Sequence, residues 1–177
     1  MIARSAIVHS TRLSLMMATR SGDVDPGLLV HLLRTRGYSA DELDRLINQR
    51  GGLLGVCGHS GMPEVLRLAA AGDERATLAL ELYCHRARKA IGAYAAVLGG
   101  LDAIAFGGGV GENAVEVRRR ILEPLAWMGL DLDGTRNAAS PVDQAITSKT
   151  SRASAWIVHV DEASEMAQVA SALLRSA

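Results

Sequence analysis

The sequence has few aromatic residues, few cysteines and no net charge, and each of these features excludes a class of protein. Phe, Trp and Tyr make up 3% of the 177 residues while 49% are hydrophobic, so the core must be built from aliphatic side chains. Two cysteines are too few for a disulfide-stapled scaffold and indicate a reducing compartment. Basic and acidic residues number 19 each, which leaves no basic field to attract nucleic acid or an anionic membrane.

Long hydrophobic runs are also missing, because no apolar stretch approaches the length that crosses a bilayer. We therefore expect a cytoplasmic protein with neither a nucleic-acid nor a membrane partner. The first 22 residues hold three arginines and no acid, a composition that resembles an organelle transit peptide. An edge strand or hairpin over Ser5–Ser14 is the favoured alternative. The length suits one domain, or one half of a larger protein.

Glycine, by contrast, is plentiful, and its densest cluster joins a strand to a helix. Residues 102–106 are short and apolar, which predicts a buried strand, and apolar residues recur at helical spacing over 115–128. Four of the five residues over 107–111 are glycine. A backbone without Cβ atoms leaves room for a ligand, and a helix N-terminus presents free N–H groups. Phosphate is the expected occupant.

Two other interpretations of this bend stay open at the level of spacing. The glycines could serve only the packing of a tight strand-to-helix turn. Alternatively, Gly109, Gly111 and Ala114 fit a dinucleotide-binding fingerprint, with Asp131 near the distance of a ribose-binding acid. Spacing alone leaves the two nucleotide interpretations nearly level.

Capping and turn signals divide the rest of the chain into helices and short strands. Asp25 followed by Pro26 predicts a helix start, with Leu28, Leu29, Leu32 and Leu33 on its buried face. The remaining predicted elements are a helix opened by the capping box Ser39–Glu42, a strand or extended turn over Leu53–Val56, a helix after Pro63, a long helix over Asp73–Leu98 lined by Leu78 and Leu82, a strand-like piece at Ala145–Thr147, a buried strand over Ala155–Val160 and a final helix.

Charged residues next to these elements offer two further candidate sites. Arg20 lies in a loop with Asp23 and Asp25, where a weak surface ion pair is the simplest expectation. Asp161 and Glu162 follow the last predicted strand, at the edge where open α/β sheets bind ligands. Their carboxylates could hold Mg²⁺ or could simply cap the following helix. Cys57, His59, Cys84 and His85 do not have a spacing that indicates a zinc site.

Several longer motifs, in order along the chain, resemble the acetate kinase family. They are Met-Ala-Thr-Arg-Ser-Gly-Asp-Val-Asp-Pro at 17–26, Gly-Asp-Glu-Arg-Ala at 72–76, Ile-Gly-Ala-Tyr at 91–94, Gly-Gly-Leu-Asp at 99–102 and Phe-Gly-Gly-Gly-Val-Gly-Glu-Asn at 106–113. The resemblance covers nearly the whole chain. It implies an α/β, actin-like (ribonuclease H-like) domain, with a mixed sheet flanked by helices and a helical insertion. It further implies that residues 1–177 are a single domain, corresponding to the carboxyl-terminal half of a two-domain family member.

The resemblance also implies a chemistry and a set of site residues. The family transfers phosphate between ATP and acetate, giving acetyl phosphate and ADP, and works as a homodimer joined through this half. Arg20 falls on the catalytic arginine, and Glu162 on the glutamate associated with Mg²⁺. The ATP loop is favoured over the dinucleotide fingerprint, and its residues are Gly107, Gly108, Gly109, Val110, Gly111, Glu112 and Asn113.

Departures from the family pattern shape the expected activity. The amino-terminal half, which carries other catalytic groups in the family, is absent, so we expect little or no kinase turnover from this chain alone. The alternative is a non-catalytic module that dimerises and binds nucleotide. The family usually has an aspartate and an arginine beside the adenine, and here Pro63 replaces that arginine. Propionate or butyrate could replace acetate, because the acyl pocket lies largely in the missing half.

Overall fold

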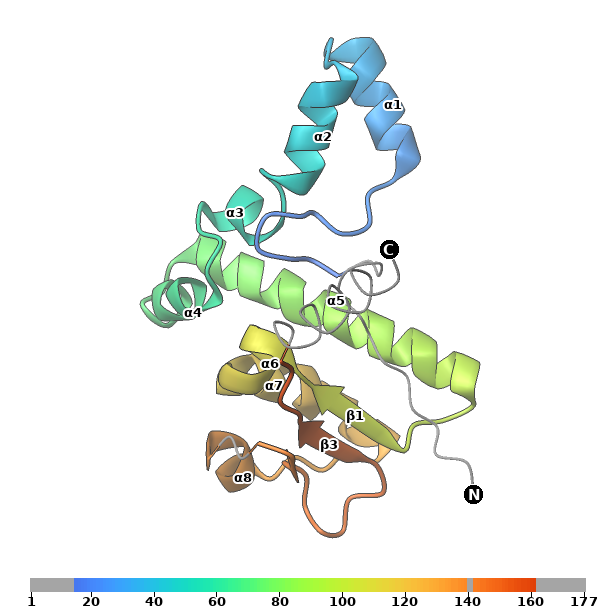
Figure 1. Ribbon diagram of the computed structural model, residues 1–177, viewed down its shortest axis with the longest axis vertical. Helices are drawn as coiled ribbons and strands as arrows, with labels where there is room; N and C mark the ends of the chain where they lie inside the picture. The colour runs from blue at the N-terminus through green and yellow to red at the C-terminus, as the bar shows by residue number, and fades with distance from the viewer. Residues whose placement is uncertain (1–14, 140–141, 162–177) are drawn as a thin grey trace, which may run out of the picture.

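The chain folds as a helical part followed by a small mixed sheet with its own covering helices (Figure 1). The computed structural model describes residues 15–139 and 142–161. The helical part comprises α1 (Pro26–Thr35), α2 (Ala40–Asn48), α3 (Gly52–Cys57), α4 (Met62–Ala70) and α5 (Glu74–Leu98). The remaining elements are β1 (Ala103–Phe106), α6 (Gly108–Asn113), α7 (Val115–Leu122), the 3₁₀ helix η1 (Glu123–Met128), α8 (Gly134–Ala139), β2 (Gln144–Ala145) and β3 (Ser154–Ile157).

The sheet has the strand order β1-β3-β2, with β1 parallel to β3 and β2 antiparallel to it. Strands form at both predicted places, although β3 ends at Ile157 rather than at Val160. The burial predicted for the first strand is wrong within the described residues, since none of the β1 residues is buried and Ala105 is exposed. Phe106 lies opposite Ile157 in the register, so the two parallel strands end together. This common end brings the glycine bend after β1 beside the residues that follow β3, which is the edge where α/β sheets bind ligands.

Helix α5 confirms the long helix predicted over Asp73–Leu98. The Asp73 side chain caps its start by accepting the Ala76 N–H at 2.7 Å. Its end is closed by the Gly100 N–H, which donates to the Ala95 carbonyl at 2.8 Å. In Figure 1 this helix runs beside the sheet, with α3 and α4 near its beginning. None of the helices in the described ranges is both long and apolar enough to cross a bilayer.

The side of α5 that packs into the core differs in part from the prediction. Leu78 was expected on the buried side, but it is 50% exposed. Small residues, Ala76 and Ala79, face inward with Leu80 and let α3, α4 and α7 approach closely. The core joins α5 to α7 and to the sheet, and its buried members are Met16, Leu53, Met62, Val65, Ala76, Ala79, Leu80, Cys84, Ala114, Val117, Ile121, Leu122, Leu125, Leu130, Ile146, Ala153, Ala155 and Ile157.

Helix α1 starts where the caps predicted, but its predicted buried face is wrong. None of its residues is buried, and Leu28 and Leu33 are 50% and 42% exposed. Figure 1 shows α1 and α2 projecting away from the long helix and the sheet. An apolar stripe on a helix is buried only if another element covers it, and within residues 15–139 and 142–161 none covers this one.

The segment Leu53–Val56 is helical, which corrects the prediction of a strand or extended turn. The helix α3 is only six residues long, too short for apolar periodicity to reveal it. It begins at Gly52, whose φ of +62° favours glycine and whose Cα lies against the Met17 carbonyl. The Leu53 and Leu54 N–H groups donate to Met17 and Ala18 carbonyls at 2.9 and 3.0 Å, so a distant loop caps this helix.

The strand β1 lies at one side of the described sheet. Its Asp102 and Phe106 carbonyls accept N–H groups of Ser154 and Val158, at 2.9 Å each. Because alternate residues of a strand hydrogen bond toward opposite sides, the main-chain groups of Ala103 and Ala105 face away from β3. The described residues put no strand on that side.

Candidate functional site

The glycine bend, residues 107–111, follows β1 and includes the start of α6. Two of its four glycines are closely packed against other residues. A Cβ atom on Gly107 would lie 2.5 Å from Cγ2 of Val160, which follows β3. A Cβ atom on Gly111 would lie 3.0 Å from the carbonyl carbon of Phe106. The packing explanation for the glycines therefore applies to these two positions, where the bend folds back against both parallel strands.

The other two glycines of the bend face open space. Gly108 has φ +69°, a conformation that a residue with a Cβ adopts only with strain. Apart from the chain neighbours and the backbone of α6 itself, no described atom comes within 4 Å of where a Cβ would be on Gly108 or Gly109. A ligand could therefore approach the main chain directly at these two residues. Close packing therefore accounts for Gly107 and Gly111, and backbone conformation accounts for Gly108.

The helical segment predicted over 115–128 is present as α7 followed by η1, but the bend does not run straight into it. The bend leads first into the separate helix α6, which has six residues and breaks at Ala114, where ψ is 83°. So short a helix has only a small dipole, so the anion-binding argument rests on individual amides. Gly109 and Val110 lie in the first turn, where N–H groups have no intrahelical acceptor. The Gly108 N–H donates to Oε1 of Glu112 at 2.9 Å.

Glu112 was predicted to contact nucleotide, but its carboxylate bonds to three groups of the protein. Besides Gly108, Oε1 accepts the Val160 N–H at 3.1 Å, and Oε2 lies 3.1 Å from Nδ1 of His159. The Glu112 side chain is 15% exposed, against 61% for that of His159. The hydrogen bond from His159 lowers the pKa of Glu112 below its usual range, and the same bond raises the pKa of His159.

Arg118 bonds to the end of α6, and the sequence did not predict this structural role. The sequence placed it among the polar residues of a helix face, yet it is fully buried on α7. Its Nη1 donates to the carbonyls of Gly111 and Glu112 at 2.8 and 2.9 Å. Its Nε and Nη2 donate to the Asn137 side-chain and main-chain oxygens at 2.7 and 3.0 Å. Burial lowers the pKa of Arg118. The last turn of α6 is thereby fixed to α8.

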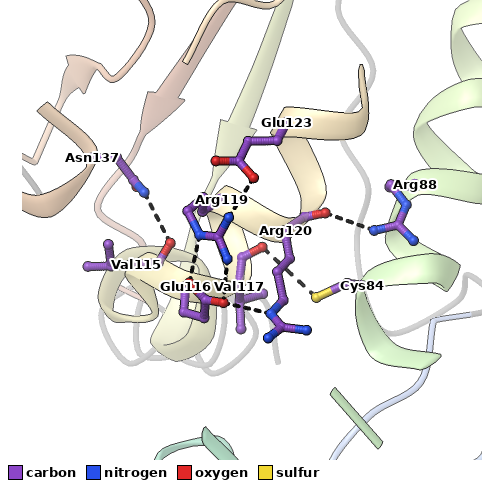
Figure 2. Close-up of polar contacts among 9 residues, drawn as sticks. All are labelled: Cys84, Arg88, Val115, Glu116, Val117, Arg119, Arg120, Glu123 and Asn137. Atoms are coloured by element: carbon purple, nitrogen blue, oxygen red, sulfur yellow. Dashed lines mark hydrogen bonds and ion pairs between the residues drawn. The ribbon is translucent and has the colours of Figure 1, made fainter. Parts of the chain in front are cut away.

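The outer face of α7 carries an ion-pair cluster formed by Glu116, Arg119, Arg120 and Glu123. Figure 2 shows both arginines turned toward Glu116, whose Oε1 lies 2.7 Å from each. The hydrogen bond from Arg119 lowers the pKa of Glu116 to about 2. Figure 2 also shows Arg88 of α5 donating to the Arg120 carbonyl, at 2.8 Å. These guanidinium groups stabilise α7 behind the glycine bend.

Arg20 lies in the loop before α1 and is exposed. The surface ion pairs with Asp23 or Asp25 do not form, and the Asp25 carboxylate instead accepts the Gly27 N–H at 2.6 Å. The loop itself is well anchored, since the Ser21 N–H donates to the Ile47 carbonyl at 2.9 Å and Arg86 of α5 donates to the Ser21 carbonyl. Within the described part of the chain, the Arg20 guanidinium has no hydrogen-bond or ion-pair partner.

Other predicted site residues have different outcomes. Glu162 lies outside the described residues, and Asp161 is the last of them and is exposed. The Asp131 carboxylate accepts the Ser148 hydroxyl at 2.6 Å. Cys84 is buried, and burial raises the pKa of its thiol to about 11, while the Cys57 thiol donates to the Leu53 carbonyl at 3.2 Å. In the described ranges, His, Cys, Asp and Glu form no group of three suited to a metal ion.

Comparison with known proteins extends these observations. The sequence matches the family described as the Acetokinase family over residues 11–168. The acetate kinase of Streptomyces avermitilis is 46% identical over 164 residues, which are 92% of this chain and 40% of the relative. The crystal structure of Porphyromonas gingivalis acetate kinase superimposes with a TM-score of 0.82 and 38% identity, over 92% of this chain and 41% of that one.

A propionate kinase from Francisella tularensis subsp. tularensis SCHU S4 is similar to the same extent, with a TM-score of 0.79 and 39% identity over 85% of this chain and 38% of that one. The chain therefore spans about 40% of the length of the relatives that it matches. These neighbours confirm the actin-like fold with a mixed sheet flanked by helices. The dinucleotide-binding interpretation of Gly109, Gly111 and Asp131 is wrong for this fold.

Proposed function

The chain belongs to the acetokinase family, and on that premise we propose that it carries the nucleotide-phosphate site of an ATP-dependent phosphotransferase. The reaction would be acetate plus ATP giving acetyl phosphate plus ADP. The observation that carries the proposal is the open main chain at Gly108 and Gly109, at the common end of two parallel strands. Because these two residues have no Cβ atom, phosphate oxygens could approach their main-chain atoms closely.

Arg20 is proposed to stabilise the transferring phosphoryl group. In a loose transition state the charge spreads over peripheral oxygens, so catalysis consists mainly of positioning and charge neutralisation. A guanidinium can donate two parallel hydrogen bonds to such oxygens. An anchored loop with an exposed arginine, which no described side chain pairs, supports this role.

Mg²⁺ is the proposed metal cofactor. Asp161 and Glu162 follow β3 in the sequence, directly after Val160, which packs against Gly107, and carboxylate oxygens are the donors that Mg²⁺ prefers. A bound Mg²⁺ would offset the negative charge of the phosphates. The residues would be Glu162, by resemblance, with Asp161 as its neighbour. We further propose that the protein is cytoplasmic and forms a homodimer through this chain, as one domain over residues 1–177 that corresponds to the carboxyl-terminal half of a two-domain protein.

The acyl substrate is proposed to be acetate because the relatives at 44–46% identity are named acetate kinases. A propionate kinase matches this chain as well as an acetate kinase does, at 39% against 38% identity. The region covered here therefore does not distinguish the acyl chain. Competition between acetate and propionate in a complete enzyme would identify the preferred substrate.

The chain alone is expected to give little or no turnover, since it spans about 40% of the length of its relatives. The competing proposal is a non-catalytic module that dimerises and binds nucleotide. Incubation of the purified chain with MgATP and acetate, with acetyl phosphate trapped as hydroxamate, separates the two. Robust turnover that disappears in Arg20→Ala would contradict the expected inactivity.

Gly109→Ala is expected to weaken MgATP binding at least about tenfold without destabilising the protein. No described atom lies within 4 Å of the added methyl group, and alanine favours helix over glycine by about 0.5–1 kcal/mol. The methyl group would instead occupy space that phosphate oxygens need. Isothermal titration with MgATP and thermal unfolding, performed on the same samples, measure both effects.

Gly134→Ala is the matched control for this substitution, because Gly134 also lies in the first turn of a six-residue helix and also has open space around it. It lies on α8, away from the bend in sequence. We expect its affinity for MgATP to equal that of the unchanged chain. Equal affinity in both alanine variants would mean that nucleotide does not approach Gly109.

A further inference from the structure

We propose that Glu112 is a positioning residue, whose carboxylate fastens the glycine bend to the end of β3, rather than a group that contacts nucleotide. The expected effect on MgATP affinity rests on the proposed function, whereas the role of Glu112 in holding the bend does not. The carboxylate joins three points of the fold: Gly108 at the start of α6, and His159 and Val160 after β3.

The geometry explains why an acid is needed at this position. Glu112 lies one helical turn after Gly108, so its side chain can reach back to the Gly108 N–H at 2.9 Å, as an acid does at a helix start. The same Oε1 accepts the Val160 N–H at 3.1 Å, while Oε2 faces the His159 ring. An ionised carboxylate is an acceptor with several lone pairs, and it accepts stronger hydrogen bonds than a neutral group.

The consequence for a ligand follows from where these bonds lie. The Gly108 N–H is already engaged, so the amides left for a phosphate are those of Gly109 and Val110. Their direction depends on the bend staying against β3, where Gly107 packs on Val160. Loss of the Glu112 bonds would let the bend fluctuate, and binding would then have to order it.

The contact between Glu112 and His159 can be followed in solution, because the hydrogen bond between them raises the pKa of His159.

The test compares Glu112→Ala and Glu112→Gln with the unchanged chain, by nuclear magnetic resonance and by MgATP titration. In Glu112→Ala the Gly108 and Val160 amides should exchange with solvent about tenfold faster or more, and MgATP affinity should fall about tenfold. Glutamine keeps an acceptor oxygen but has no charge. Glu112→Gln should therefore retain most amide protection and most affinity, while the His159 pKa falls toward its ordinary value. Glu123→Gln, an acid on the outer cluster, should change none of these.

Two results would overturn the proposal. Unchanged exchange at Gly108 and Val160 in Glu112→Ala would mean that the carboxylate does not hold the bend. Full amide protection in Glu112→Gln together with an affinity as low as that of Glu112→Ala would mean that the charge acts directly on the ligand. If the unchanged chain binds no MgATP, the proposed function fails, whereas the exchange rates and the His159 pKa still decide the role of Glu112.

Discussion

Replacing Arg20 with alanine is expected to lower kcat by about a thousandfold or more, while the dissociation constant for MgATP changes little. The experiment needs a complete enzyme, and a chimera supplies one: this chain replaces the region that it matches in the Streptomyces avermitilis relative. The guanidinium is proposed to meet charge that develops in the transition state, so its loss should affect the chemical step and not ground-state binding. Steady-state kinetics and nucleotide titration measure the two quantities separately.

Two further variants of the chimera sharpen this prediction. Arg20→Lys keeps the charge but cannot form parallel hydrogen bonds, so we expect it to recover only part of the lost rate. Arg34→Ala removes an exposed arginine from the last turn of α1 and should leave kcat unchanged. Equal losses of kcat and of nucleotide affinity in Arg20→Ala would show that Arg20 binds ATP rather than the migrating phosphoryl group.

Arg118→Met should lower the free energy of unfolding by about 3 kcal/mol. Methionine replaces the aliphatic stem of the fully buried arginine, but no donors remain for the carbonyls of Gly111, Glu112 and Asn137. Buried acceptors without partners are costly, because water cannot replace the lost bonds. For a chain of this size the melting temperature should fall by about 6–12 °C. Urea and thermal unfolding of the isolated chain measure both.

Arg119→Met is the control for this substitution on the next residue of the same helix. Its side chain is 42% exposed and pairs with Glu116 and Glu123. Exposed ion pairs contribute little, so the variant should lose less than about 1 kcal/mol. A loss in Arg118→Met no larger than that in Arg119→Met would contradict the role assigned to the buried guanidinium.

Local signals in the sequence predicted much of this fold. The Asp25 and Asp73 caps and the box at Ser39 act through side chains within three residues of the helix starts, so they could be recognised without the rest of the molecule. The strands at 103–106 and 154–157 are short and mostly apolar. Both kinds of signal depend only on neighbouring residues.

The errors arose where distant contacts decide the structure. Leu53–Val56 is helical because the loop at Met17 and Ala18 supplies acceptors for its first amides. Leu28 is exposed because no described element covers α1. Arg118 is buried because carbonyls of the glycine bend and of Asn137 accept its donors. Periodicity within one helix contains no information about such partners.

For the candidate site, the sequence predicted the position of the bend but not the contacts of its residues. The glycines at 107–111 predicted a bend after a strand, and the structure has one there. The sequence could not tell that Gly107 and Gly111 serve packing while Gly108 and Gly109 face open space, since this depends on Val160 and Phe106. Nor could it predict that Glu112 turns toward His159, which lies 47 residues further along the chain.

Whether nucleotide phosphate binds at the glycine bend can be measured by following the backbone amide chemical shifts of the isolated chain while MgATP is added. We expect the largest shifts at Gly109 and Val110, and we expect them to saturate with added nucleotide. At equal nucleotide concentration, Gly109→Ala should reduce them. Saturable shifts confined to other parts of the chain, with residues 107–113 unaffected, would contradict binding at the bend.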